Sequence, residues 1–88
     1  MKDHKSLEPG ESVSYTTRPV GMKTTLFMKN VGKGDGKITV KPMIAVDPTD
    51  FQFGPGDSEE FDLSFLKGGL AEVRNTGMTN VEVWTDYI

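Results

Sequence analysis

Glycine and proline interrupt this sequence about every ten residues, and that spacing limits what the chain can fold into. The 88 residues include ten glycines and five prolines, and the stretches between them are rich in Val, Thr, Phe and Tyr. No window of a dozen residues carries an apolar stripe of helical spacing that is free of both helix breakers. The pattern therefore predicts short β-strands and no substantial helix.

Alternation within these stretches predicts which side chains face a core. Successive side chains of a strand point to opposite faces, so every second residue shares a face. We predict strands at roughly 11–18, 23–30, 36–46, 50–53, 57–66, 69–75 and 80–87. The inward residues predicted from them are Leu26, Met28, Ile38, Val40, Phe61, Leu63, Phe65, Val81, Val83 and Thr85.

Two short phrases each occur twice in the chain. LEPGESVSY at 7–15 returns as FGPGDSEEF at 53–61, and LFMKNVG at 26–32 returns as LAEVRNTG at 70–77. The proline of the first phrase and the asparagine of the second are 21 residues apart in one copy and 20 in the other. This regular spacing predicts an internal duplication of a three-stranded unit.

A three-stranded sheet with one apolar face cannot bury that face alone, whereas two such sheets packed face to face can. We therefore predict an all-β fold with a flexible leader at 1–6 and one domain at 7–88, containing repeats at about 7–46 and 53–88. The domain is expected to be a small antiparallel β-sandwich of about seven strands, immunoglobulin-like or jelly-roll-like. In this interpretation each repeat forms its own sheet.

The net charge of −3 hides an asymmetry between the two halves of the chain. Residues 1–44 carry eight Lys or Arg and four Asp or Glu, a balance of +4, while residues 45–88 carry two and nine, a balance of −7. Exposed aromatic side chains ringed by charge are typical interface anchors. The predicted binding residues are Phe27, Lys29, Lys37 and Lys41 on a basic outer surface, and Glu82, Trp84 and Asp86 on an acidic one.

The stretch at residues 29–65 resembles immunoglobulin-like sandwich modules. In KNVGKGDGKITVKPMIAVDPTDFQFGPGDSEEFDLSF, Asn-x-Gly follows one strand and the FGPGDS phrase precedes another. Bacterial repeats of the CARDB type and major-sperm-protein and cilia-associated domains are similar. The resemblance implies a non-enzymatic module that serves as a spacer, an oligomer-forming unit or a peptide-binding platform.

The residues that most enzyme and cofactor sites need are missing. His4 is the lone histidine and there is no cysteine, so a Ser-His-acid triad, a Cys-His pair and a histidine-rich zinc site all lack parts. GKGDGK at 32–37 has the glycines of a phosphate loop, but Ile38 and a strand follow where a P-loop has Ser or Thr and a helix. We predict a non-enzyme with no cofactor and no metal.

Acidic residues leave two alternatives open. An acid pair of Asp62 with Glu82 or Asp86 would suit glycoside hydrolysis, but solvated acids on a sheet face are far commoner. Loops rich in oxygen ligands can bind Ca²⁺. The spacing of these acids matches no EF-hand, and it favours instead a role in preventing strand edges from pairing with other strands. The acids in the second case are Asp47, Asp50, Asp57, Glu59 and Glu60.

These features favour a module for protein–protein interaction or self-assembly as a homo-oligomer. The alternative is a carbohydrate-binding module in which Trp84, with Tyr87 or Phe27, stacks on sugar rings. Binding of an anionic lipid or nucleic acid through the lysines ranks lower, because an acidic chain is a poor phosphate binder. No apolar run approaches the roughly 18 residues of a membrane span, residues 1–10 lack a secretory h-region, and both extracellular and cytoplasmic locations stay open.

Overall fold

The computed structural model describes residues 4–44 and 46–87. These residues form eight strands and one short 3₁₀ helix, in two antiparallel four-stranded sheets. The elements are β1 (Lys5–Leu7), β2 (Ser12–Thr16), β3 (Thr25–Asn30), β4 (Gly36–Pro42), β5 (Thr49–Phe53), β6 (Ser58–Asp62), η1 (Ser64–Leu66), β7 (Leu70–Asn75) and β8 (Val81–Thr85). Within these residues the structure contains no helix with the length and hydropathy of a membrane span.

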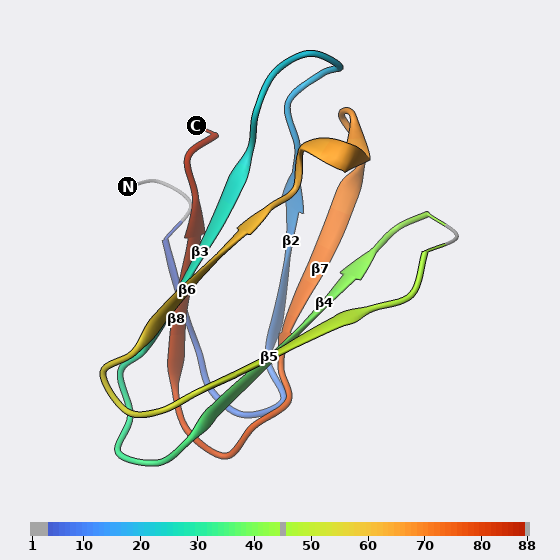
Figure 1. Cartoon of the computed structure of the whole chain (residues 1–88). Coiled ribbons are helices and arrows are strands. Elements are labelled where there is room, and N and C mark those ends of the chain that lie inside the picture. The colour runs from blue at the N-terminus through green and yellow to red at the C-terminus, as the bar shows by residue number, and fades with distance from the viewer. Residues whose placement is uncertain (1–3, 45, 88) are drawn as a thin grey trace.

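Sheet I has the strand order β1-β8-β3-β6, and sheet II has the order β2-β7-β4-β5 (Figure 1). Eight strands divided in this way form a jelly roll. The all-β sandwich prediction is confirmed, with the jelly-roll alternative realised. The prediction that each repeat forms its own sheet is wrong, because each sheet takes two strands from each half of the chain. The two halves therefore share backbone hydrogen bonds as well as a core.

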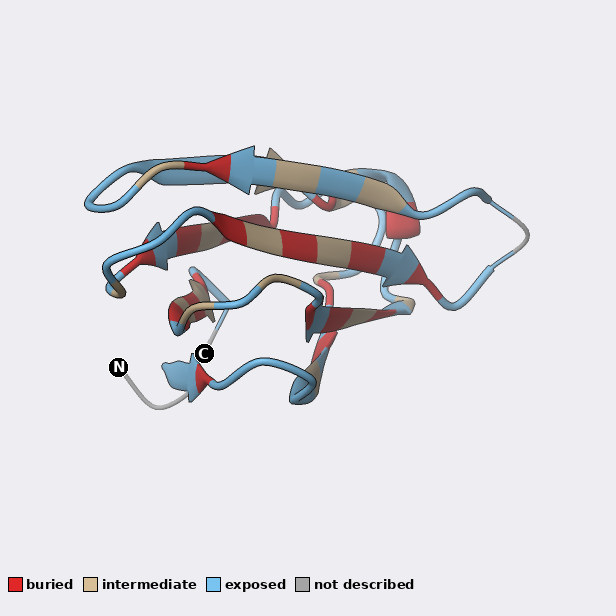
Figure 2. Cartoon of the chain, turned by 90° about the horizontal axis from the view of Figure 1, so that it is seen from below, coloured by how far each residue is buried: buried red, intermediate tan, exposed pale blue. Residues whose placement is uncertain are grey.

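Side chains from both sheets fill the space between them, and the less buried positions alternate with buried ones along the central strands (Figure 2). Most of the predicted inward residues are confirmed, including Leu26, Val40 and Val83, each with none of its surface exposed. Phe65 is an exception, with 41% of its surface exposed. The reason is that β6 ends at Asp62 and the chain turns into η1, which directs Leu66 inward instead.

The repeated Asn-x-Gly phrases end equivalent strands with equivalent hydrogen bonds. Asn30 Nδ2 donates to the carbonyls of Gly34 (2.8 Å) and Phe53 (3.1 Å), and Asn30 Oδ1 accepts from the Gly32 N–H (2.9 Å). In the second copy, Asn75 Nδ2 donates to the carbonyls of Thr79 (2.7 Å) and Leu7 (2.8 Å), and its Oδ1 accepts from the Gly77 N–H (3.0 Å). Each asparagine thus joins its own loop to the opposite half of the chain.

The repeated Pro-Gly phrases complete this arrangement. The Gly10 N–H donates to the Asn75 carbonyl (2.8 Å), and the Gly56 N–H donates to the Asn30 carbonyl (3.1 Å). Both glycines have positive φ, +90° and +80°, in the position of a tight turn that follows proline. Each Pro-Gly turn therefore packs against the asparagine of the other copy, so the repeated phrases are the points where the two halves join.

The chain enters the sandwich earlier than the predicted domain start at residue 7. Lys5 and Ser6 of the predicted leader belong to β1 and pair with β8. Residues 1–3 of that leader lie outside the described residues, as do residue 45 in the first predicted repeat and residue 88 at the end of the second.

Candidate binding surfaces

An aromatic stack lies on the outer face of sheet I. Because β3 and β8 are antiparallel neighbours, Phe27 is directly opposite Trp84, and their ring centroids are 5.6 Å apart with planes 15° from parallel. The ring of His4 stacks on Trp84 with centroids 4.7 Å apart, and His4 Nε2 lies 2.8 Å from Glu82 Oε1. We call His4, Trp84 and Phe27 the aromatic stack. His4 had no predicted role, since a lone histidine near the start of a sequence gives no signal of its contacts.

The predicted basic and acidic surfaces are not separate. Lys29 on β3 is directly opposite Glu82 on β8, as Phe27 is opposite Trp84. The prediction of two oppositely charged surfaces is therefore wrong for these four residues, because their strands come from different halves of the chain but are neighbours in one sheet. Opposite charges across a strand pair stabilise the sheet modestly.

The two other predicted lysines lie on sheet II. Lys37 and Lys41 are on β4, where Lys37 is opposite Gln52 on β5 and Lys41 is opposite Glu72 on β7. They belong to a different sheet from Phe27 and Lys29, so no single surface holds the predicted basic set.

Asp86, the last of the predicted binding residues, holds the β2–β3 loop in place through hydrogen bonds. Its Oδ1 accepts from Arg18 (3.1 Å) and from the Thr25 N–H (2.9 Å). Arg18 also donates to the carbonyls of Asp86 and Lys23, and its guanidinium lies 5.1 Å from the centre of the Tyr87 ring. The pair therefore ties the β2–β3 loop to the end of β8, which is a structural role.

Each acid of the predicted pairs has a hydrogen-bonding or ionic partner of its own. Asp62 is opposite Thr25 on β3, and hydrogen bonds from the Ser64 side chain and backbone N–H hold the pKa of Asp62 below its usual value. A general acid needs the opposite shift. Glu82 and Asp86 contact His4 and Arg18 instead. Within residues 4–44 and 46–87 no group of three or more potential ligands is placed to hold a metal ion.

Stacking determines what the aromatic residues can offer a ligand. Trp84 lies between His4 and Phe27, so both of its ring faces are covered by protein. A sugar ring stacks on an open aromatic face, and His4 and Phe27 already stack on the Trp84 ring. Arg18 occupies a face of Tyr87 in the same way. The carbohydrate alternative remains a prediction, and this geometry weighs against Trp84 as its platform.

The Phe27–Trp84 contact is expected to contribute measurably to stability. Stacked aromatic pairs contribute about 1 kcal/mol beyond the burial of their area. A double-mutant cycle of Phe27→Ala and Trp84→Ala, followed by urea unfolding, should therefore give a coupling energy of about that size. The control cycle combines Phe51→Ala with Trp84→Ala. These two residues lie on different sheets, so the effects of the two substitutions on stability should be additive. Additivity in the Phe27 cycle would show that the rings do not stack in solution.

Exposed apolar side chains lie at one end of the sandwich, several of them in segments that were predicted as strands but lie beyond the strand ends, as Met43, Ile44 and Val46 lie beyond β4. This end is formed by the β2–β3, β4–β5 and β6–β7 connections and the residues after β8 (Figure 1). Met43 and Val20, for example, have 58% and 69% of their surface exposed. We call this surface the apolar end, and its exposed residues are Val20, Met22, Met43, Ile44, Val46, Phe65, Leu70 and Tyr87. The sequence signal that could have revealed the apolar end is the presence of apolar residues next to glycine or proline in the loops.

Backbone hydrogen bonds hold the loops of the apolar end together. The Thr17 N–H donates to the Gly69 carbonyl (3.0 Å), and the Met43 N–H donates to the Leu70 carbonyl (2.9 Å). The Gly68 N–H donates to Thr17 Oγ1 (3.0 Å). Three connections that are far apart in the sequence therefore form one supported surface.

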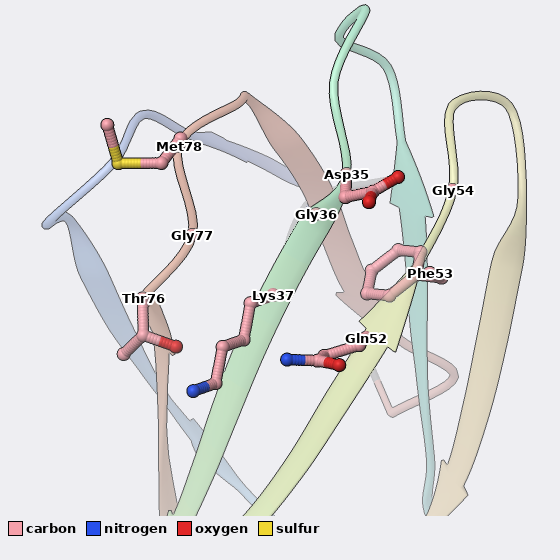
Figure 3. Close-up of a pocket in the computed structure, with 9 residues that line it drawn as sticks. All are labelled: Asp35, Gly36, Lys37, Gln52, Phe53, Gly54, Thr76, Gly77 and Met78. Atoms are coloured by element: carbon pink, nitrogen blue, oxygen red, sulfur yellow. The ribbon is translucent and has the colours of Figure 1, made fainter.

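The opposite end holds an open polar pocket of about 460 Å³. Figure 3 shows Lys37 lying between Thr76 and Gln52 in this pocket. The remaining lining residues are Asp35, Gly36, Phe53, Gly54, Gly77 and Met78. The charged residues among this lining are Asp35 and Lys37.

Comparison with known proteins supplies a family and a fold. Over residues 6–86 the chain matches the model described as "Family of unknown function (DUF8244)". No curated protein matches the chain significantly. The resemblance to CARDB-type and major-sperm-protein modules therefore stays a prediction.

Two solved structures share the arrangement of strands. The solution NMR structure of a de novo designed double-stranded β-helix is 21% identical, with a TM-score of 0.51, and the match covers 93% of this chain and 91% of that one. The crystal structure of CapF with the inhibitor 3-isopropenyl-tropolone is 16% identical, with a TM-score of 0.55, and the match covers 97% of this chain but 23% of CapF. At these identities the likeness shows the fold alone. With its double-stranded β-helix fold, this chain belongs to the family of unknown function DUF8244.

Proposed function

We propose that the chain is a non-enzymatic module that binds a protein partner through its apolar end. The observation that carries this proposal is the distribution of exposed hydrophobic residues. Of the ten large hydrophobic side chains that are exposed among the described residues, eight lie at the apolar end, whereas Val31 and Met78 are at the other. Exposed apolar side chains concentrated at one end of a small domain favour an interaction site there.

The chemistry of the apolar end suits a protein partner. Met22 and Met43 have flexible, polarisable side chains that adapt to irregular apolar surfaces. Burial of apolar surface is the main favourable contribution to most protein–protein association, and the apolar end offers eight exposed side chains for it. The loops are already joined by hydrogen bonds, which lowers the entropy lost on binding.

Substitution at the apolar end is expected to abolish capture of the partner. Val20, Met22 and Met43 are changed together to serine, which removes apolar surface from residues that are more than half exposed and lie outside the core cluster. Proteins captured by the immobilised wild-type domain from extracts of its own cells are identified, and each is then purified for titration by calorimetry. A genuine partner should bind the triple variant at least tenfold more weakly.

Met78→Ser is the matched control, because Met78 is 91% exposed at the opposite end. This variant should bind the purified partner like the wild type. If the triple variant and Met78→Ser capture the same proteins with equal affinity, the apolar end is not the binding surface and the proposal fails.

A further inference from the structure

The sandwich has four edge strands among its described residues, and one of them lacks the usual protection. The edges are β1 and β6 in sheet I and β2 and β5 in sheet II. An edge strand presents backbone groups that can pair with another chain, and proteins block this with charge, proline or a very short strand. Natural edges are protected because uncontrolled pairing leads to aggregation.

Three of the four edges carry such protection. β6 has Glu59, Glu60 and Asp62, and β5 has Asp50. β1 is three residues long and includes a lysine. In contrast, β2 reads SVSYT over five residues and contains neither charge nor proline. It is therefore the edge best suited to pair with another strand.

The hydrogen bonds to β7 show which groups of β2 face outward. The Thr17 N–H donates to the Gly69 carbonyl, and the Glu11 carbonyl accepts from the Asn75 N–H. In an antiparallel ladder the residues that bond a given neighbour alternate, so the odd-numbered residues of β2 bond β7. The backbone N–H and C=O groups of Ser12, Ser14 and Thr16 consequently point away from sheet II.

The sequence of β2 is complementary to itself. Antiparallel pairing of two copies about a two-fold axis at Ser14 places Ser12 of one copy opposite Thr16 of the other. All three outward residues then meet an outward residue, and each pair exchanges two N–H···O bonds. Their hydroxyls lie side by side on the exposed face, where Ser–Thr pairs are favourable. The same operation on β6 would place Glu60 opposite itself, which is unfavourable.

We propose that β2 is a self-association site at which two copies of this chain pair edge to edge, joining their four-stranded sheets II into one continuous sheet. The partner is a second copy because the strand is self-complementary and uncharged, and like charges do not meet along the pair. The edge is also accessible: a pocket of about 260 Å³ opens beside Ser14 and Thr16. This pocket also borders Tyr87 of the apolar end. The pairing uses backbone groups of β2, however, and the apolar end uses side chains of the connections, so the two proposals can fail independently.

Sedimentation of the full chain from micromolar to millimolar concentration tests the inference. The wild type should show a monomer–dimer equilibrium that high salt does not weaken, because no ion pairs join the strands. Ser14→Lys should weaken dimerisation at least tenfold, since two lysines would meet at the axis. Ser14 is exposed, so the substitution should leave the core intact. A circular dichroism spectrum like that of the wild type would show that the variant is folded.

Ser58→Lys on the edge strand β6 is the matched control and should dimerise like the wild type. Hydrogen exchange adds a residue-level measurement: the amides of Ser12, Ser14 and Thr16 should become protected as the protein concentration rises. The Met22→Ser variant, changed at the apolar end, should show the same protection. A wild type that stays monomeric throughout, a dimer whose three amides remain unprotected, or a Ser14→Lys variant that dimerises normally would each overturn the proposal.

Discussion

Replacement of Asn75 by alanine is expected to lower the free energy of unfolding by about 3 kcal/mol. The side chain is fully buried, and its amide makes hydrogen bonds to Leu7, Thr79 and Gly77. Truncation leaves two carbonyls and one N–H without this partner, each in a protein environment where water replaces it poorly. For a small domain with a total stability of about 5 to 10 kcal/mol, this loss is a large fraction.

Guanidinium unfolding measures the effect, and two further variants make the experiment decisive. Asn30→Ala should cost about as much as Asn75→Ala, because Asn30 makes the equivalent bonds in the other half of the chain. Asn80→Ala should change stability by less than about 0.5 kcal/mol, since that residue is exposed. If Asn75→Ala is as mild as Asn80→Ala, the asparagine does not join the halves in the way described.

Gly77→Ala is expected to destabilise the domain by about 2 to 3 kcal/mol through overpacking. A Cβ at this position would lie 2.7 Å from the backbone nitrogen of Lys37 and 3.2 Å from its Cβ. Neither atom can move without displacing the start of β4, whose Lys37 carbonyl also accepts from the Thr76 N–H (3.0 Å). Close approach of two backbones, rather than an unusual φ, therefore demands glycine here.

Gly34→Ala provides the control for chain entropy and loop position. Gly34 is in a loop at the same end of the sandwich, and an added Cβ there meets nothing within 4 Å. Its midpoint of thermal unfolding should stay equal to or slightly above that of the wild type. Equal melting temperatures for the Gly77 and Gly34 variants would refute the close approach of the 76–80 loop to β4.

Much of the fold could be predicted from the sequence, because its signals are local. Alternation placed Leu26, Val40 and Val83 correctly, since the period of a strand depends on its own backbone. The same reasoning failed at Phe65, where the chain leaves the extended conformation for η1 and the alternation no longer applies. The repeated phrases were correctly identified as turn signals, but their tertiary partners were not.

The candidate sites were less predictable, because they depend on which strands are neighbours. Phe27, Lys29, Glu82 and Trp84 were each chosen from the sequence as surface residues, yet their grouping was wrong. The contact of His4 with Trp84 joins residues from opposite ends of the chain and leaves no local trace. The apolar end was missed because most of its residues fell within predicted strands that end earlier in the structure, as β4 does at Pro42 and β8 at Thr85.

By itself the sequence determined where strands begin and turn, which side chains they bury and which phrases repeat. These features follow from the conformational limits of glycine, proline and asparagine and from the two-residue period of a strand. Only the tertiary structure decided that β3 pairs with β8 and β4 with β7, so that basic and acidic strands share a sheet. Every residue type except proline carries the same backbone donor and acceptor. The backbone hydrogen bonds therefore leave no mark in the sequence that shows which strands will pair.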